Sequence, residues 1–440
     1  MPDFAADISL DPEQLARPSG LDKLRVRGGR ELNGHVAISG AKNAGLKLMC
    51  AALLTDDSLA LYNMPNRLGD IRTMGALLRH IGAHVGLRSD GTAVVQAGSA
   101  IAPYAPYDLV RRMRAGILTL GPLVARFGRA DISLPGGCAI GTRPVDYHLE
   151  GLKAMGAEIA LEAGYIKARA PNGLKGGHYV FPRPSHTATE NLMMAATLAK
   201  GETVLGNCAR EPEIVDLADC LTAMGAKIEG AGTSRICITG VDHLHGAAHT
   251  ILPDRIETGT WLCGVGLCGG VITLSNATLA HLNALMGPLE AAGLSVSSNT
   301  DDTITARRNG ARLQGIDLMT EGYPGFPTDL QAQIMAMLSL AEGASMITET
   351  IFENRFMHVP ELNRMGANIS VQGNSAIVRG VDKLVGANVM ATDLRASVAL
   401  VLAGIAAEGE TVIDRIYHLD RGYEGIVEKL QNCGLDVVRV

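Results

Sequence analysis

The sequence predicts an α/β protein of two domains, each built from three units of about 70 residues. Three observations lead to this fold class. A phrase of leucine, glycine and a β-branched residue occurs six times, and an apolar Ala/Leu/Met-rich segment recurs in step with it. The third is length, because 440 residues are more than one hydrophobic core usually holds.

The repeated phrase reads leucine, three residues, glycine, two residues, then valine or isoleucine. Its glycines are Gly82, Gly156, Gly225, Gly293, Gly366 and Gly434, at spacings of 74, 69, 68, 73 and 68 residues. Each phrase predicts the end of a helix, a glycine cap and the start of a strand. Six units of this length are longer than usual solenoid repeats, so we expect two globular domains of three units each.

The apolar segments are clearest at 190–200, 330–342 and 395–408, each followed by a glycine. They are apolar around most of the helical circumference, which predicts helices buried inside a domain. Each unit therefore reads strand, buried helix, strand, outer helix, strand.

Polar side chains cluster where the buried helices are expected to begin. They are Lys42, Asn43, Arg114, Thr187, Thr189, Glu190, Asp254, Arg255, Glu257, Thr328, Asp329, Thr392, Asp393 and Arg395. The Thr and Asp residues alone fit simple helix caps. Cations at helix N-termini are unfavourable, so the lysine and arginines together favour a site for an anionic ligand. If the repeats are arranged symmetrically, these helix ends converge on a shared cleft.

Composition narrows the class of protein. The net charge is -6 and no basic block occurs, so we expect no nucleic-acid partner. No apolar run approaches the ~18 residues of a membrane helix. Residues 1–20 are polar and predict a flexible tail without the apolar core of a signal peptide. Eight cysteines without a CxxC pair predict free thiols and a cytoplasmic protein.

Two further patterns are set aside. Gly264, Gly266 and Gly269 match GxGxxG, but they end a predicted buried helix and no strand leads into them, so we do not expect a dinucleotide site. A second group, His243, His245 and His249, lies in a Gly/Ala-rich turn region without a matching acid or cysteine cluster. We interpret these histidines as exposed loop residues and expect no metal site.

Cys138 lies on a glycine-rich run, Leu134-Pro-Gly-Gly-Cys-Ala-Ile-Gly-Thr-Arg143. A cysteine on a flexible loop near arginines can be an accessible thiol with a lowered pKa. A structural cysteine fits the same pattern equally well, and the nearby Arg126, Arg129 and Arg143 favour the reactive thiol only modestly.

Ten runs of the chain resemble the UDP-N-acetylglucosamine enolpyruvyl transferases. They lie at 38–44, 105–110, 120–128, 134–138, 209–216, 252–259, 326–329, 352–358, 391–397 and 420–424. The resemblance implies a two-domain, inside-out α/β barrel of six βαβαββ repeats. One domain would cover 43–252 and the other 21–42 plus 253–440, with the active site between them.

The resemblance also implies a reaction. Phosphoenolpyruvate and UDP-N-acetylglucosamine would give the enolpyruvyl ether and phosphate by addition and elimination, in the first committed step of peptidoglycan precursor synthesis. Cys138 would be the general acid, able to form a covalent adduct with phosphoenolpyruvate and to react with its epoxide mimic fosfomycin. Asp329 would be the base near the sugar hydroxyl. No cofactor and no metal are implied, and a monomer or weak oligomer is expected.

The implied site residues fall into three overlapping groups. The catalytic group is Lys42, Cys138, Asp329, Asp393, Arg395 and Arg421. The phosphoenolpyruvate group is Lys42, Asn43, Arg143 and Arg421. The UDP-N-acetylglucosamine group is Asn43, Arg114, Arg143, Pro144, Val145, Asp146, Tyr147, Arg183, Ser185, His186, Asp329, Ile351 and Arg355.

The nucleotide group departs from the usual pattern at Tyr147, Arg183 and Ser185-His186-Thr187. These departures leave two alternatives open. One is a paralogous enolpyruvyl transferase acting on another uridine nucleotide, and the other is a non-catalytic sensor of nucleotide sugars. A shikimate-phosphate enolpyruvyl transferase would share the fold, but the Pro-Gly-Gly-Cys run argues against it.

Overall fold

The computed structural model describes residues 22–99, 101–135, 145–308 and 310–440. The expected flexible tail at 1–20 lies outside these ranges, and so do Cys138, Arg143 and Pro144. The described residues divide into two compact units. Unit 1 comprises 40–135 and 145–252, and unit 2 comprises 22–39 and 253–440. Residues 40–42 group with unit 1, whereas the sequence-based division placed them in the second domain.

The elements of unit 1 alternate between helices and short strands. In chain order they are α2 (Lys42–Ala51), η1 (Ala52–Leu54), β3 (Leu59–Tyr62), α3 (Gly69–Ile81), β4 (His84–Leu87), β5 (Ala93–Gln96), β6 (Tyr104–Ala105), α4 (Tyr107–Val110), η2 (Arg114–Thr119), α5 (Leu120–Phe127), β7 (Arg129–Ser133), α6 (Asp146–Ala154), β8 (Glu158–Glu162), β9 (Tyr165–Arg169), β10 (His178–Val180), α7 (His186–Ala196), β11 (Glu202–Gly206), α8 (Pro212–Ala223), β12 (Lys227–Glu229), β13 (Arg235–Thr239) and β14 (Ala247–Thr250).

Unit 2 repeats the alternation. Its elements are β1 (Leu24–Arg27), β2 (Gly34–Ala37), α9 (Arg255–Cys268), β15 (Gly270–Ser275), η3 (Leu279–Leu282), α10 (Asn283–Ala292), β16 (Ser295–Thr300), β17 (Thr303–Arg308), β18 (Leu318–Met319), η4 (Thr328–Leu330), α11 (Gln331–Leu338), β19 (Ala344–Thr348), α12 (Val359–Arg364), β20 (Asn368–Gln372), β21 (Ser375–Arg379), β22 (Asn388–Met390), α13 (Leu394–Ala406), β23 (Glu410–Asp414), η5 (Ile416–Arg421), α14 (Ile426–Asn432) and β24 (Asp436–Arg439).

Within the part of the chain that the structure describes, the strands form six four-stranded sheets. Those of unit 1 have the orders β14-β3-β5-β4, β6-β7-β9-β8 and β10-β11-β13-β12. Those of unit 2 have the orders β16-β17-β15-β2, β18-β19-β21-β20 and β22-β23-β1-β24. Each sheet has one parallel pair, such as β10 with β11, and its other pairs are antiparallel. The predicted fold of six βαβαββ repeats is confirmed, because parallel neighbours require a helical crossover.

Strands distant in sequence complete three of these sheets. β14 pairs with β3 in the first sheet of unit 1, β2 pairs with β15, and β1 lies between β23 and β24. Within the described residues, the chain passes from one unit to the other near Ser39 and again near Leu252. At these passages Ala41 N–H donates to Leu252 O at 2.8 Å within unit 1, and Asp254 N–H donates to Ser39 O at 2.9 Å within unit 2.

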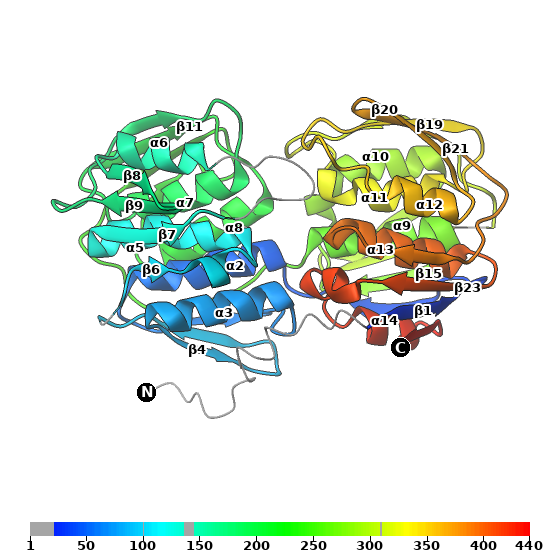
Figure 1. Ribbon diagram of the computed structural model, residues 1–440, viewed down its shortest axis with the longest axis horizontal. Helices are drawn as coiled ribbons and strands as arrows, with labels where there is room; N and C mark the ends of the chain where they lie inside the picture. The colour runs from blue at the N-terminus through cyan, green and yellow to red at the C-terminus, as the bar shows by residue number, and fades with distance from the viewer. Residues whose placement is uncertain (1–21, 100, 136–144, 309) are drawn as a thin grey trace. The chain divides into compact units, whose positions relative to one another are not determined.

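The core of unit 2 is a layer of three mutually contacting helices, α9, α11 and α13 (Figure 1). Every residue of α11 is buried, as are Arg395–Ile405 in α13. In unit 1 the helices α2 and α7 are buried in the same way. The prediction of buried helices is confirmed, and the continuous apolar surface of each helix explains why the sheets lie outside them.

The six repeated glycines lie between a helix and the next strand, as predicted. Gly82 shows the reason: its φ of 114° is left-handed, and its N–H donates to Leu78 O and Arg79 O at the end of α3. A left-handed residue at this position ends the helix, and only glycine adopts that conformation without steric cost. The other five glycines also have positive φ values.

The structure shows where the residues of the two patterns set aside, the GxGxxG match and the histidine group, lie. Gly264 and Gly266 lie inside α9, and a side chain at Gly266 would collide with Met337, so these glycines serve helix packing. His243 and His245 are exposed, but the prediction for His249 was wrong. It lies on β14, and its Nε2 is 3.0 Å from Oδ1 of Asp216 because α8 packs against this strand. Within the described residues, no His/Cys/Asp/Glu group could hold a metal.

None of the helices in the described ranges is long and apolar enough to cross a membrane. The described cysteines, which exclude Cys138, are free thiols.

Candidate active site

Asp329 is the centre of the polar network in unit 2. It lies in η4, just before the buried helix α11. Arg355 donates from Nη2 to Oδ1 of Asp329 at 2.6 Å, and Arg395 donates from Nη2 to Oδ2 at 3.0 Å. Both arginine side chains are 5% exposed, whereas that of Asp329 is 28% exposed. The two guanidinium groups therefore orient a carboxylate that a ligand can still reach.

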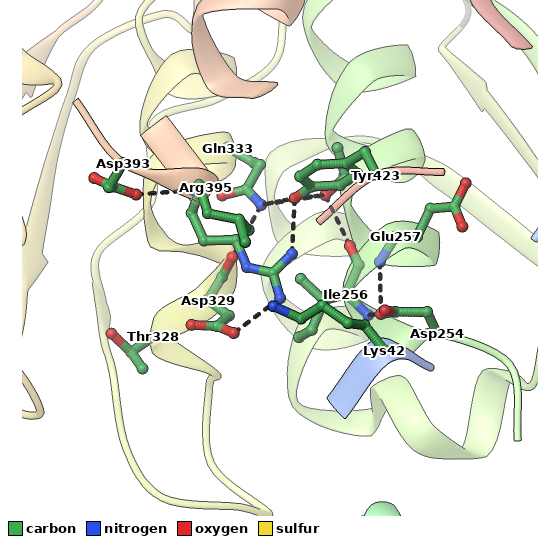
Figure 2. Close-up of polar contacts among 12 residues, drawn as sticks. Lys42, Asp254, Ile256, Glu257, Thr328, Asp329, Gln333, Asp393, Arg395 and Tyr423 are labelled. Atoms are coloured by element: carbon green, nitrogen blue, oxygen red, sulfur yellow. Dashed lines mark hydrogen bonds and ion pairs between the residues drawn. The ribbon is translucent and has the colours of Figure 1, made fainter. Parts of the chain in front are cut away.

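A layer of buried, uncharged side chains holds Arg395 in place (Figure 2). Arg395 donates from Nη1 to the hydroxyl of Tyr423 at 3.2 Å. Gln333 Nε2 lies 3.0 Å from the same hydroxyl, 3.1 Å from Thr260 Oγ1 and 2.9 Å from the carbonyl of Asp329. These contacts join α9, α11 and α13, so the positions of Asp329 and Arg395 depend on the packing of the three helices.

The pKa values in this layer follow from burial and charge. Burial opposes the charge of Arg395, but Tyr423, Asp329 and Asp254 outweigh it and raise the pKa of the guanidinium. Burial raises the pKa of Tyr423 despite the nearby Arg395. The layer thus keeps a permanent cation beside Asp329.

Two aspartates begin buried helices in the same way. Asp254 caps α9 by accepting from the N–H groups of Ile256 and Glu257 at 2.8 and 3.0 Å. Asp393 caps α13 by accepting from the N–H groups of Arg395 and Ala396 at the same distances. The cap orients the first turn of α13, from which Arg395 extends towards Asp329 (Figure 2).

Glu349 is a buried carboxylate next to this network, and its exposed fraction is 3%. It accepts hydrogen bonds from the backbone N–H groups of Ile351 and Phe352 at 2.9 and 3.2 Å, and from the hydroxyls of Thr320 and Thr328 at 2.9 and 2.8 Å. Because the N–H of Ile351 is used, a backbone contact from Ile351 to a ligand would fall on its carbonyl oxygen.

Arg421 lies at the end of η5 and is partly buried. Burial, with the positive charge of Arg421, lowers the pKa of His418 to about 4. His418 is therefore neutral near pH 7 and adds no second positive charge beside Arg421.

In unit 1, Lys42 is the first residue of α2, and its Nζ is 3.1 Å from Oδ2 of Asp70. The two side chains are 10% and 7% exposed. Asn43 follows Lys42 on the same helix and is partly exposed. The carboxylate of Asp70 holds the ammonium group at the helix start, where the helix dipole alone would disfavour it.

A second polar group of unit 1 surrounds His148 on α6. Asn191 donates from Nδ2 to Nδ1 of His148 at 2.8 Å, and Nε2 of His148 lies 3.3 Å from Thr187 Oγ1. Burial, with the positive charge of Arg114, lowers the pKa of His148 to about 3. The imidazole is therefore a neutral link between α6 and α7, and Asn191 also donates to Ile117 O in η2 at 3.4 Å. The expected nucleotide residues Val145, Asp146 and Tyr147 precede His148, with Asp146 exposed.

The start of α7 carries the other expected nucleotide residues. Ser185 caps the helix by accepting from Ala188 N–H at 3.4 Å, and Arg183 is exposed. Nε2 of His186 is 3.1 Å from Oε1 of Glu190, whose Oε2 is 3.2 Å from Lys47 Nζ. Burial opposes the charge of His186, but Glu190 outweighs it, so the pKa of His186 is raised.

The expected residues thus fall into several groups. Asp329, Arg355, Arg395 and Asp393 come together in unit 2, with Ile351 linked through Glu349. In unit 1 the expected residues lie at the starts of α2, η2, α6 and α7. Cys138, Arg143 and Pro144 lie outside the described residues.

Several supporting residues were missed from the sequence. Asp70 and Glu349 are the clearest, because each holds an expected residue by a direct hydrogen bond. A signal for Glu349 existed: it follows the β-branched pair Ile347-Thr348 and lies three residues before the matching run that begins at Phe352. Nothing in the sequence pairs Asp70 with Lys42, since 28 residues separate them.

Comparisons with known proteins agree with this fold. The family described as EPSP synthase (3-phosphoshikimate 1-carboxyvinyltransferase) matches residues 26–430. The structure of the enolpyruvyl transferase NikO from Streptomyces tendae has a TM-score of 0.86 at 26% identity, covering 95% of this chain and 99% of that one. EPSP synthase from Acinetobacter baumannii has a TM-score of 0.72 at 18% identity, covering 95% and 100%, and supports the fold alone. The chain belongs to the enolpyruvyl transferase family.

Proteins with similar sequences indicate the branch of the enolpyruvyl transferase family to which the chain belongs. A protein of Granulibacter bethesdensis is 59% identical over 421 residues, covering 96% of this chain and all of its own length. One from Acidiphilium cryptum is 60% identical with the same coverage. Both are named UDP-N-acetylglucosamine 1-carboxyvinyltransferase, and this chain lies in their branch of the family.

Proposed function

We propose that this protein transfers the enolpyruvyl group of phosphoenolpyruvate to the 3'-hydroxyl of UDP-N-acetylglucosamine and releases phosphate. The observation that carries the proposal is the 59–60% identity, over 96% of the chain, to relatives named for this activity. The carboxylate of Asp329, oriented by two arginines and partly exposed, supplies a group that can take the hydroxyl proton.

The reaction balances as an addition followed by an elimination. The sugar oxygen bonds to C2 of phosphoenolpyruvate, its proton passes to a base, and a general acid protonates C3. The resulting tetrahedral ketal carries a methyl group and the phosphate. Loss of a proton from C3 and of phosphate from C2 then restores the double bond. Such a path needs a base, an acid and cations for the phosphate and carboxylate.

Asp329 is the proposed base. Arg355 and Arg395 hold one carboxylate oxygen each, which fixes the direction in which the carboxylate faces the sugar. Asp393 supports this arrangement through the first turn of α13. Fixing a reacting group before the substrate arrives lowers the entropy cost of the reaction.

Lys42, Asn43 and Arg421 are the proposed phosphoenolpyruvate ligands among the described residues. Lys42 provides a point charge, and Arg421 can form paired hydrogen bonds to a phosphate or carboxylate. Cys138 as general acid and adduct site, and Arg143 as a phosphate ligand, complete the proposal from outside the described residues.

The starts of α6 and α7 are the proposed nucleotide-binding segments. Ser185 already caps α7, and the exposed Asp146 and Arg183 are available for a ligand. Free N–H groups at these helix starts favour the diphosphate. Tyr147 and His186 differ from the usual pattern, and this departure favours one other candidate, an enzyme that uses a different uridine nucleotide as acceptor.

The proposed setting is peptidoglycan precursor synthesis in the cytoplasm. The free thiols of the described cysteines fit that reducing compartment.

Phosphate release from phosphoenolpyruvate tests the proposal. The acceptor is UDP-N-acetylglucosamine, free UMP or shikimate 3-phosphate in separate reactions. Turnover is expected only with UDP-N-acetylglucosamine. Turnover only with UMP would establish the other candidate, and no turnover with any acceptor would favour a sensor of nucleotide sugars.

A further inference from the structure

Glu349 connects two parts of unit 2 that the proposed reaction uses. One oxygen, Oε1, accepts from Thr320 Oγ1 and from the backbone N–H groups of Ile351 and Phe352. Among the described residues, the other oxygen, Oε2, accepts the hydroxyl proton of Thr328 alone, at 2.8 Å. Each oxygen thus supports a different segment: one holds the turn after β19, and the other holds the start of η4.

In the series of hydrogen bonds that connects Oε2 to Asp329, each bond has a fixed donor and a fixed acceptor. Thr328 gives its hydroxyl proton to Glu349, so the lone pairs of Thr328 Oγ1 are left to accept. Arg355 donates from Nη1 to that oxygen at 3.0 Å, and from Nη2 to Asp329 Oδ1 at 2.6 Å. Only an acceptor at the position of Oε2 keeps this sequence of donors and acceptors.

Arg355 also contacts the segment that is held by Oε1 of Glu349. Its guanidinium lies 5.2 Å from the ring centre of Phe352, whose N–H is held by Oε1 of Glu349. The side chains of Arg355 and Glu349 are both buried, at 5% and 3% residue exposure. Asp329 and the backbone at Ile351 are therefore tied to one carboxylate by short contacts.

Chain folding alone does not require a carboxylate at this position. A glutamine oxygen would satisfy the three donors that meet at Oε1 without the cost of burying a charge. What glutamine would not supply is the second acceptor, since its amide nitrogen only donates. The feature specific to glutamate is the contact to Thr328.

We propose that Glu349 is a positioning residue, which sets Asp329 through Thr328 and Arg355 and sets the sugar-facing backbone at Ile351. This rests on the proposed role of Asp329 as the base. The two carboxylate oxygens of Glu349 have different effects on the kinetics. Oε2 governs the placement of the base and therefore kcat, whereas Oε1 governs the segment at Ile351 and therefore the KM for the sugar nucleotide.

Steady-state phosphate release with UDP-N-acetylglucosamine tests this division. Glu349→Gln keeps an acceptor at Oε1, so kcat should fall about 10- to 100-fold while the KM for the sugar nucleotide changes less than about 2-fold. Glu349→Ala should lower kcat similarly and also raise that KM about 10-fold. Glu342→Gln is the matched control: this exposed glutamate accepts from Gln314 Nε2 at 3.1 Å, and its variant should match the wild type.

Variants of Thr328 test the same contact independently, because they leave the buried carboxylate of Glu349 in place. Thr328→Val should reproduce the kcat loss of Glu349→Gln, and Thr328→Ser should restore activity. Because both changes break one connection, the double variant should be no slower than either single variant.

Rates are divided by the fraction of folded protein, determined by thermal melting, so that a purely structural role is visible. Wild-type kcat in folded Glu349→Gln and Thr328→Val would overturn the proposal, and so would losses that multiply in the double variant. Loss of the proposed function is a separate result, since it would appear as absent turnover in the wild type.

Discussion

Arg395 and Asp329 meet at 3.0 Å, although they begin two different buried helices, α13 and α11. The contact joins the third and second repeats of unit 2, and Arg355 adds a second cation to the same carboxylate. The arrangement places a partly exposed carboxylate beside two buried guanidinium groups.

Asp329→Asn should lower kcat about 10²- to 10⁴-fold, the range that one positioned acid or base contributes. An amide is nearly the same shape but cannot take the proton of the sugar hydroxyl. The measurement is steady-state phosphate release from phosphoenolpyruvate. Asp382→Asn, which affects a 95% exposed carboxylate paired with Arg312, is the control and should keep the wild-type rate. A rate within a few-fold of wild type in Asp329→Asn would exclude it as the base.

Arg395→Ala should destabilise unit 2 by about 1–3 kcal/mol, because it removes a buried cation that donates to both Asp329 and Tyr423. The free energy of unfolding is measured by urea titration. Lys383→Ala removes a cation from an exposed ion pair with Glu408 and should change stability little. Equal stability losses in the two variants would show that the contact to Asp329 has no special weight.

His148 should make the protein less stable in acid. Its folded pKa of about 3 lies below the ordinary value of 6.5, so the unfolded chain binds the proton first as pH falls. Stability should therefore decrease from pH 6.5 towards pH 3, by up to about 1.4 kcal/mol per pH unit for this residue. His148→Gln should reduce that slope. Identical slopes for wild type and variant would contradict the buried, neutral histidine.

The contribution of His186 to stability should depend on pH in the opposite way from that of His148. Its folded pKa is raised, chiefly because the carboxylate of Glu190 outweighs burial and the charge of Lys47, with Glu211 adding to the effect. Its stabilisation should be complete below the ordinary pKa of 6.5 and lost as pH rises through the folded pKa. The stability difference between wild type and His186→Gln should shrink with increasing pH. A difference that grows with pH would refute the charged pair.

The fold could be predicted from local patterns because its repeats are local. The phrase from Leu78 to Val85 marks a helix end and a strand start within eight residues, and the same signal recurs in every unit. The buried helices were predictable because their apolar surface is continuous, as in 395–408. Sequence alone also indicated that Asp393 and Arg395 begin such a helix.

Contacts between distant residues could not be predicted in this way. Lys42 meets Asp70 across two helices, and Glu349 reaches back to Thr328 through a turn that no periodicity describes. His249 was misassigned because the Gly/Ala-rich segment around it resembles a loop, whereas pairing of β14 with β3 makes it a strand. Tertiary pairing decides such positions, and a single sequence does not display it.

The central claim is addition of the UDP-N-acetylglucosamine hydroxyl to phosphoenolpyruvate, followed by elimination, and it can be measured in heavy water. Addition places a solvent-derived deuteron on C3, and elimination removes one of the three hydrogens of that methyl group. The account predicts the enolpyruvyl ether of UDP-N-acetylglucosamine with deuterium in its vinyl group, detected by NMR and mass spectrometry. An ether without vinyl deuterium, or no ether from this acceptor, would contradict it.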